Sequence, residues 1–329
     1  MLIFRWGILG LGKIAHKFAE DLKTISGAQL QAVGSRSKER ADEFAQTHGA
    51  PFSFGTYAGL IDSGEVDAVY IATPHTSHLE LTLACLEAGI PVLCEKPMGM
   101  NLSQVQTMVQ AAEKHQTYLM EALWTRFLPS TKKLLALLDK GEIGKVEGLR
   151  ADFGFKVGPL TGQRITDPAL GGGSLLDIGI YPVFLAQLLL GKPMEIQAMA
   201  RMGETGVDID CSINLRYKGG QLAQLYSTLL ARTKTEATIH GQDGLVHWHS
   251  RWHEPSNFSI LRRFEDQPEN HFFEYDNNGY AYEARAVMED VRAGKLQNEL
   301  WSWVDSLLLH ETLTKIRAEI GLSYPMEVK

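Results

Sequence analysis

The first third of the chain alternates short apolar runs with longer amphipathic segments. Apolar runs at 2–9, 30–33, 66–72 and 91–94 indicate buried strands. The segments between them, at 13–23, 38–48, 77–88 and 103–115, have the length and polarity of helices. Strands that alternate with helices of 10–15 residues are typical of parallel β–α–β units. This pattern predicts a doubly wound parallel sheet, an α/β Rossmann domain over residues 1–121.

Beyond residue 120 the pattern changes to strand after strand. A helix is expected at 130–140, strands at 146–155, 196–201, 209–217, 221–229, 235–240 and 244–248, and two helices at 280–293 and 299–320. The segment Lys218-Gly219-Gly220-Gln221 supplies the two-residue, glycine-containing turn of a tight hairpin. We therefore expect residues 122–329 to form an α+β domain on a largely antiparallel open sheet.

Composition narrows the class of protein. The chain is 44% hydrophobic and 22% charged, with a net charge of −7, which fits a globular protein and disfavours a surface for nucleic acid or anionic membranes. No apolar run approaches the roughly 20 residues of a membrane span, and the apolar start is too short for a signal peptide. The cysteines Cys85, Cys94 and Cys211 are scattered. We expect a reduced cytoplasmic protein with no membrane or nucleic-acid partner.

The segment Gly10-Leu11-Gly12-Lys13-Ile14-Ala15 follows the first strand and opens the first helix. It matches the pattern G-x-G-x-x-G/A, in which glycines let backbone N–H groups approach a pyrophosphate at a helix N-terminus. Glycines can also simply end a strand, but the strand before and the helix after favour dinucleotide binding. We expect Gly10, Gly12, Lys13 and Ile14 to bind the cofactor.

The end of the second strand favours a particular dinucleotide. Where dinucleotide folds that bind NAD usually carry an acid for the ribose 2′-hydroxyl, this chain has Ser35 followed by Arg36. A hydroxyl and a guanidinium suit a 2′-phosphate, because the guanidinium pairs with phosphate oxygens. The alternative is that Arg36 belongs to a solvated helix start. The sequence predicts NADP, with NAD the less favoured cofactor.

Two further strand ends point to the same crevice, because ligands of open α/β sheets bind beyond the carboxyl ends of the strands. One is the segment Thr73-Pro74-His75-Thr76-Ser77-His78, and the other is Glu95-Lys96-Pro97. Lys96 stands at the tip of a buried strand, where an ammonium either has a chemical task or is simply the first exposed residue. Thr73, Pro74, His75, His78, Glu95 and Lys96 are our candidates for contact with the cofactor.

The richest segment of the second domain runs from Gly171-Gly172-Gly173-Ser174 to Asp177 and Tyr181. Asp177 and Tyr181 are four residues apart and share a helix face. In one interpretation Ser174 caps the helix with Asp177 as its capping partner, and Tyr181 is a core residue. In the other, Tyr181, Lys96 and Asp177 form a cluster in which the ammonium favours the phenolate and lowers the pKa of the tyrosine.

With these motifs in order along its length, the chain resembles the Gfo/Idh/MocA oxidoreductase family. The segment Met120-Glu121-Ala122-Leu123-Trp124-Thr125-Arg126-Phe127, together with Tyr181, is most similar to the subgroup of dimeric dihydrodiol dehydrogenase and NADP-dependent D-xylose 1-dehydrogenase. The resemblance implies a Rossmann domain, an open-sheet domain and a homodimer formed through that sheet. It also implies that Lys96 and Tyr181 are catalytic, that Asp177 belongs to the site, and that the peptide bond before Pro97 is cis.

The resemblance further implies a reaction. A hydroxyl and a carbonyl of a polyhydroxylated small molecule (a sugar, a cyclitol or a dihydrodiol) would interconvert, with Tyr181 transferring the proton and Lys96 favouring the developing oxyanion. Trp124, Arg126 and Arg164 are the candidates for substrate contact, although Trp124 could equally be a core residue. Asp177 could orient Lys96 or bind a second substrate hydroxyl.

Two alternatives to this enzyme remain at this stage. A non-catalytic protein that senses the dinucleotide could retain the same fold, and a different Rossmann enzyme such as a methyltransferase would share the glycine motif. His247, His249 and His253 could suggest a metal, but no nearby carboxylate completes a recognisable site, so we expect none and consider them surface or core histidines.

Overall fold

The computed structural model describes residues 2–327, which divide into two compact units. Unit 1 comprises Met1–Phe127 and Tyr275–Leu307, and unit 2 comprises Leu128–Glu274 and Leu308–Lys329. The predicted division at residue 121 has a single boundary and differs from this one. The segment from Tyr275 returns to the first unit, and local sequence pattern gives no sign of that long-range packing.

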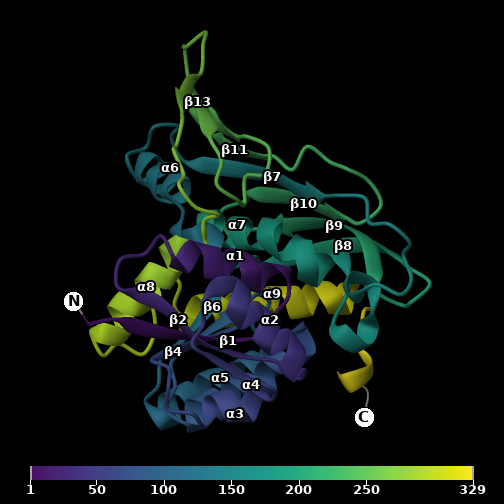
Figure 1. Ribbon diagram of the computed structural model, residues 1–329. Coiled ribbons are helices and arrows are strands. Elements are labelled where there is room, and N and C mark those ends of the chain that lie inside the picture. The colour runs from purple at the N-terminus through teal and green to yellow at the C-terminus, as the bar shows by residue number, and fades with distance from the viewer. Residues whose placement is uncertain (1, 328–329) are drawn as a thin grey trace. The chain divides into compact units, whose positions relative to one another are not determined.

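Unit 1 is built on a six-stranded parallel sheet with the order β3-β2-β1-β4-β5-β6 (Figure 1). Its strands are β1 Phe4–Leu9, β2 Ala28–Gly34, β3 Phe52–Phe54, β4 Ala68–Ile71, β5 Val92–Glu95 and β6 Leu119–Ala122. This is the strand order of a dinucleotide-binding sheet, which reverses direction between β1 and β4. The predicted doubly wound fold is confirmed, but the sequence did not predict the short strands β3 and β6 or the short helix at Tyr57–Ile61.

The helices of unit 1 are α1 Lys13–Leu22, α2 Lys38–His48, α3 Tyr57–Ile61, α4 His78–Glu87, α5 Leu102–His115 and α8 Tyr280–Arg292. Their ends follow local chemistry: Asn101 caps α5 by accepting from the backbone N–H of Gln104, and Gly49 ends α2 in the left-handed conformation at φ 80°. In Figure 1, α3, α4 and α5 gather on one side of the strands. One core cluster joins strand and helix residues, including Leu9, Val69, Ile71, Val92, Leu86, Val105 and Met108.

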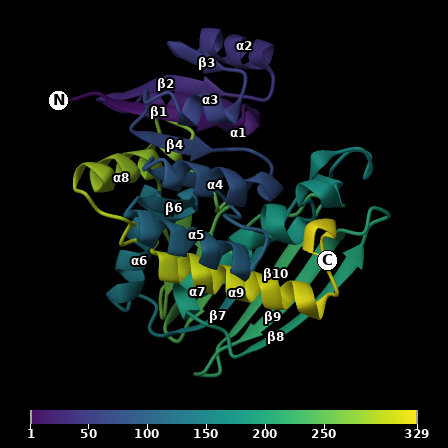
Figure 2. The ribbon, with the colours of Figure 1, turned by 90° about the horizontal axis from the view of Figure 1, so that it is seen from below.

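Unit 2 contains an eight-stranded sheet with the order β14-β13-β12-β11-β7-β10-β9-β8. Its strands are β7 Val146–Gly154, β8 Glu195–Met202, β9 Asp208–Arg216, β10 Leu222–Thr228, β11 Ala237–Gly241, β12 Gly244–Trp248, β13 Phe258–Arg262 and β14 Glu269–His271. Only β7 and β10 pair in parallel, so the predicted, largely antiparallel sheet is confirmed (Figure 2).

The hairpin between β9 and β10 forms at the predicted place but with a longer turn. Tyr217 N–H donates to the carbonyl of Gln221, so three residues, 218–220, form the loop rather than two. Gly220 takes the left-handed conformation at φ 86°, which is the usual way to close a three-residue hairpin loop.

The helices of unit 2 are α6 Pro129–Asp139 and α7 Ile180–Leu190, and α9 Trp303–Glu319 starts in unit 1 and continues into unit 2. A π-helical turn, η5 (Leu175–Gly179), leads directly into α7. The expectation that no apolar stretch is long enough for a membrane span is wrong for Pro168–Leu190, but 83% of the most apolar window of this stretch is buried. Burial of this kind is typical of a stretch that belongs to a protein core.

Candidate active site

The glycine loop after β1 leaves room for a ligand at the start of α1. Gly10 has φ +89°, and a Cβ on it would lie 2.7 Å from the backbone nitrogen of Thr73, so only glycine fits. A Cβ on Gly12 would meet nothing within 4 Å, and no side chain caps the first turn of α1. These open backbone N–H groups suit a pyrophosphate.

Ser35 and Arg36 follow β2, as predicted. Ser35 is buried, and its hydroxyl accepts from the backbone N–H of Ser37 at 3.2 Å. Arg36 is exposed and, within residues 2–327, its guanidinium takes part in no hydrogen bond or ion pair. Lys38 differs, because its ammonium pairs with Asp42. Arg36 is thus the cation at this strand end that is available to a ligand.

The segment after β4 is buried and linked to the segment after β5. The Oγ1 of Thr73 is buried and has no hydrogen-bond partner among the described residues. His78 is fully buried, with Nε2 2.9 Å from the carbonyl of Thr73 and Nδ1 2.9 Å from the carbonyl of Pro97. His75 is also buried, at 5% exposure. His78 therefore ties the two strand ends together, while Thr73 presents an unsatisfied hydroxyl.

Glu95 and Lys96 stand at the carboxyl end of β5, and the Lys96–Pro97 peptide bond is cis, as expected. The Glu95 carboxyl accepts from the Tyr70 hydroxyl and, at 3.1 Å, from the backbone N–H of Lys96. Burial raises the pKa of Glu95, although the ammonium of Lys96 acts in the opposite direction. The sequence did not reveal that Tyr70, inside β4, holds this carboxyl.

In unit 2 the three glycines form a tight loop that only glycine allows. A Cβ on Gly172 would lie 2.7 Å from the backbone of Ile165, and one on Gly173, at φ +126°, would lie 2.3 Å from the Asp208 carboxylate. Ser174 does not cap the helix as the capping interpretation required, because its hydroxyl donates to Asp208. Asp208, which the sequence did not single out, accepts from the N–H of Leu175 instead.

The predicted residues Arg164 and Asp177 meet. One guanidinium nitrogen of Arg164 lies 2.9 Å from both carboxylate oxygens of Asp177. The Asp177 side chain is 8% exposed and that of Arg164 is 44% exposed. This geometry orients the carboxylate and leaves part of the guanidinium open to a ligand.

Tyr181 lies in the first turn of α7 beside an aromatic cluster that the sequence did not predict. Its ring centre is 4.8 Å from that of His253 and 5.9 Å from that of Phe153. His253 stacks on Phe153 and lies 3.5 Å from the carboxylate of Glu254. Burial alone would raise the pKa of Glu254, but His253 and Arg251 lower it to about 2. His253 is 72 residues from Tyr181, so no local pattern could have linked them.

The other two proposed substrate contacts occupy packed positions. Trp124 is 5% exposed and stacks on Tyr280 of α8 with ring centres 4.4 Å apart, as in the core interpretation. Arg126 donates to the carbonyl of Leu300, and burial lowers the pKa of its guanidinium. Of the three candidates, Arg164 has the clearest functional setting.

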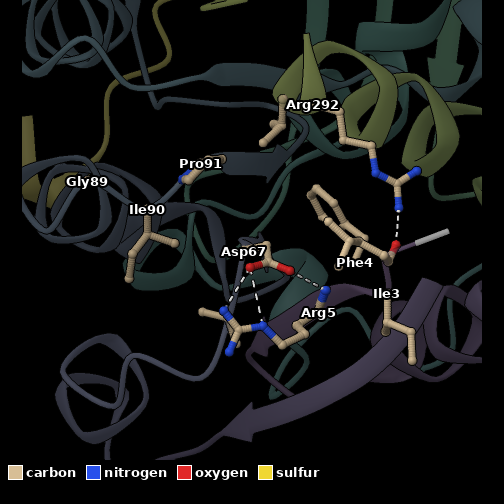
Figure 3. A pocket seen from close by; sticks show the side chains of 11 residues that line it. Ile3, Phe4, Arg5, Asp67, Gly89, Ile90, Pro91 and Arg292 are labelled. Carbon is tan, nitrogen blue, oxygen red and sulfur yellow. Dashed lines mark hydrogen bonds and ion pairs between the residues drawn. The ribbon is translucent and has the colours of Figure 1, made fainter. Parts of the chain in front are cut away.

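A cavity of about 890 Å³ lies elsewhere in unit 1, at the amino ends of β1, β4 and β5 (Figure 3). Arg5 and Asp67 form an ion pair of 2.8 Å in it, and Arg292 donates to the carbonyl of Leu2. Because ligands of such sheets bind at the carboxyl ends of the strands, this cavity is separate from the cofactor crevice.

No cluster of three or more metal-ligating side chains occurs within residues 2–327. The histidines weighed for a metal have other partners. His247 lies 3.1 Å from the carboxylate of Glu236, and His249 lies 2.6 Å from the hydroxyl of Ser259.

Comparisons with known proteins agree with this geometry. Residues 4–123 match the Gfo/Idh/MocA oxidoreductase family model with an NAD-binding Rossmann fold, and residues 131–247 match a C-terminal domain model of the same family. The trans-1,2-dihydrobenzene-1,2-diol dehydrogenase of Danio rerio is 37% identical over 99% of both chains. The human protein of the same name is 34% identical over 99% of both.

Solved structures show the same architecture. A 3-ketoreductase from Actinomadura kijaniata, in complex with NADP and TDP-benzene, superposes with a TM-score of 0.88 at 27% identity, covering 97% of this chain and 98% of that one. An aldose-aldose oxidoreductase from Caulobacter crescentus shares the fold, with a TM-score of 0.87 at 24% identity over 96% and 97% of the two chains. The enzymatic interpretation therefore replaces the sensor and methyltransferase alternatives: this chain belongs to the Gfo/Idh/MocA family and is an NAD(P)-dependent oxidoreductase of CH–OH groups.

Proposed function

We propose that the protein interconverts a hydroxyl and a carbonyl of a polyhydroxylated small molecule, a sugar, a cyclitol or a dihydrodiol, with NADP(H). The observation that carries the proposal is that this chain is 37% identical to a dihydrodiol dehydrogenase along its whole length. In this chain Lys96 lies at the end of β5, where the Glu95 carboxyl accepts from its backbone N–H, and Tyr181 lies against the ring of His253. A ketoreductase structure with bound NADP supports the cofactor assignment.

Tyr181 is the residue we assign to proton transfer. The nicotinamide, when bound, supplies the hydride chemistry. In oxidation the Tyr181 phenolate takes the proton of the substrate hydroxyl, and in reduction the Tyr181 hydroxyl gives its proton to the carbonyl oxygen. The Lys96 ammonium favours the phenolate and the developing oxyanion. His78 links the segments after β4 and β5 through the carbonyls of Thr73 and Pro97. The residues that we propose to contact the cofactor are Gly10, Gly12, Lys13, Ile14, Thr73, Pro74, His75 and Glu95.

Asp177 and Arg164 are suited to orienting a polyol. A carboxylate held by a guanidinium accepts hydrogen bonds in a fixed direction, and the half-exposed guanidinium donates to neighbouring oxygens. We assign this pair to a second substrate hydroxyl next to the reacting carbon. Trp124 and Arg126, which pack against Tyr280 and the carbonyl of Leu300, are not assigned to substrate contact.

Turnover with substitutions at Tyr181 and Lys96 tests this mechanism. NADPH consumption is followed with aldoses, ketoses and diketones, and NADP⁺ reduction with polyols and dihydrodiols. Tyr181→Phe and Lys96→Met should each lower kcat at least ~100-fold, the usual contribution of a general acid–base group. The matched controls lie in unit 2: Lys133→Met at an exposed lysine, and Tyr226→Phe at a half-buried tyrosine of β10. Full turnover in both active-site variants would overturn the mechanism.

Arg36 should decide the choice between the two dinucleotides. Its exposed guanidinium suits the 2′-phosphate that NADPH carries and NADH lacks. We expect Arg36→Ala to raise the Kd of NADPH about 10- to 100-fold and leave that of NADH unchanged, as measured by fluorescence titration. Arg285→Ala, an exposed arginine of α8, is the control. Equal Kd values for the two cofactors in the unmodified protein would refute the preference.

We also propose a homodimer formed through the open face of the eight-stranded sheet. Met199 on β8 and Leu222 on β10 point to this face and are 78% and 53% exposed. Apolar side chains on an uncovered sheet face favour association. Light scattering should give twice the chain mass, and Met199→Glu should shift it to that of one chain.

A further inference from the structure

The helix that carries Asp177 and Tyr181 begins in an unusual way. The five residues Leu175–Gly179 form a π-helical turn, and α7 continues from Ile180. A π turn changes the direction in which the following side chains leave the helix, and such turns concentrate at functional sites. Here the turn contains Asp177 and ends two residues before Tyr181, so its geometry bears on the orientation of both side chains.

Asp208 holds the start of this turn. This first residue of β9 is fully buried, and one of its carboxylate oxygens accepts from the N–H of Leu175 at 2.7 Å and from the Ser174 hydroxyl at 2.8 Å. The Ser174 hydroxyl also lies 3.0 Å from that of Ser227 on β10. A carboxylate at this place satisfies backbone donors that the helix itself leaves open.

Ser227 and two glycines, Gly173 and Gly179, pack closely around the π turn and the Asp208 carboxylate. A Cβ on Gly179, at the far end of the π turn, would lie 2.9 Å from the Ser227 hydroxyl. A Cβ on Gly173 would collide with Asp208, and the Tyr324 hydroxyl donates to the carbonyl of Gly172 at 2.8 Å. The glycine loop is therefore shaped to admit the Asp208 carboxylate, and β9 and β10 contact the turn at both ends.

We propose that Asp208 is a positioning residue, which accepts hydrogen bonds from the first turn of the helix and so fixes the directions of Asp177 and Tyr181. This inference rests on the proposed function for its catalytic consequence, but not for its structural one. Asp208 touches neither substrate nor cofactor in this role. It acts through the backbone of Leu175 and the hydroxyl of Ser174.

The test compares removal of the acceptor with its replacement. Asp208→Ala removes both hydrogen bonds, and Asp208→Asn keeps a carbonyl oxygen at the same place. We expect Asp208→Ala to lower kcat about 10- to 100-fold with less than a threefold change in KM, and Asp208→Asn to stay within about threefold of the unmodified enzyme. Asp210→Ala, a partly exposed aspartate two residues along β9, is the matched control and should change neither constant.

Hydrogen exchange of the peptide over 173–181 supplies a readout that needs no substrate. Exchange there should be at least ~10-fold faster in Asp208→Ala than in Asp208→Asn or Asp210→Ala, with the rest of unit 2 unchanged. Unmodified kcat or unmodified exchange in Asp208→Ala would overturn the positioning role. If the unmodified protein turns over no substrate, the proposed function fails while the exchange result still decides this inference. If Asp208→Ala does not fold, Ser174→Ala, which removes one of the two bonds, should show the same effects on a smaller scale.

Discussion

Two helices, one in each unit, begin at an aspartate from a distant part of the chain. In unit 1, Asp21 of α1 caps the start of α8, about 260 residues further on. In unit 2, Asp208 of β9 caps the turn that leads into α7. Both side chains are buried, at 1% and 0% exposure. The two sites thus place the same chemical group in the same structural role.

The carboxylates of Asp21 and Asp208 differ in how many hydrogen bonds their oxygens accept. Asp21 receives four hydrogen bonds of 2.7–3.1 Å, two to each oxygen, from the N–H and side-chain amide of Asn278 and from the N–H groups of Tyr280 and Ala281. Asp208 receives its two on one oxygen, and its other oxygen is buried with no hydrogen-bond partner. A buried charge is stabilising only when its hydrogen-bonding capacity is met. The difference indicates that Asp21 serves stability and that Asp208 serves the geometry of the site at a cost in stability.

The largest expected effect is the pH dependence that Asp208 gives to stability. Burial raises the pKa of Asp208 from 3.8 to about 7, against the lowering effect of its hydrogen bonds. The folded state therefore holds this proton more tightly than the unfolded chain, so the contribution of Asp208 is greatest below about pH 4 and is lost as the pH rises through 7. A rise from 3.8 to about 7 corresponds to at most ~4 kcal/mol. The groups that face Asp208 are Ser174, Leu175 N–H, Arg317, Tyr324 and Cys211.

Urea denaturation of the unmodified protein and Asp208→Asn from pH 5 to pH 8 measures this contribution. The free energy of unfolding of Asp208→Asn should exceed that of the unmodified protein at pH 8, and the excess should shrink toward pH 5. Taking the difference between the two proteins cancels the titration of all other groups. An excess that does not change with pH would mean that Asp208 is ionised throughout this range.

The same substitution at Asp21 should have the opposite sign. In Asp21→Asn the amide nitrogen replaces an oxygen that accepts two hydrogen bonds, so donors face donors in the interior. We expect a loss of about 2–4 kcal/mol in the free energy of unfolding, because buried N–H groups lose their partners. Urea denaturation at pH 8 measures it. Asp42→Asn, on an exposed ion pair with Lys38, should lose much less, because solvent screens an exposed pair. A stabilising effect of Asp21→Asn would contradict the conclusion that Asp21, unlike Asp208, contributes to stability.

The sequence predicts the helices and strands around both aspartates, but not the contacts between them. The helices at 13–22 and 280–292 follow from local periodicity, as does the strand that begins at Asp208, because each element buries one face of its own residues. That Asp21 caps a helix after residue 275 depends on the return of the chain to unit 1, which no local pattern encodes. For the same reason Ser174, with Asp177 three residues later, looked like a capping pair, whereas the acceptor at this helix start is Asp208.

In the candidate site, too, motifs identified single residues, whereas the contacts between residues became visible only in the structure. Gly10, Gly12, Lys96 and Tyr181 were recognisable because a motif specifies each residue type at a fixed spacing. Arg164 and Asp177 were both named from the sequence, but their ion pair joins a loop to the π turn and became visible only in the structure. His253, which lies against Tyr181, has no motif around it and was interpreted from the sequence as a surface or core histidine.

The smallest effect tests whether Ser174 compensates the charge of Asp208. Its hydroxyl supplies one of the two hydrogen bonds to the carboxylate. Ser174→Ala should therefore lower the free energy of unfolding by about 1 kcal/mol at pH 8, where Asp208 is largely ionised, because a hydrogen bond to a charged acceptor is lost. At pH 5 the acceptor is neutral, and the loss should fall to a few tenths of a kcal/mol. In the Asp208→Asn background the substitution should have the same small effect at both pH values, because the acceptor is neutral throughout. An equal loss at pH 5 and pH 8 in the unmodified background would assign Ser174 to packing against Ser227 instead.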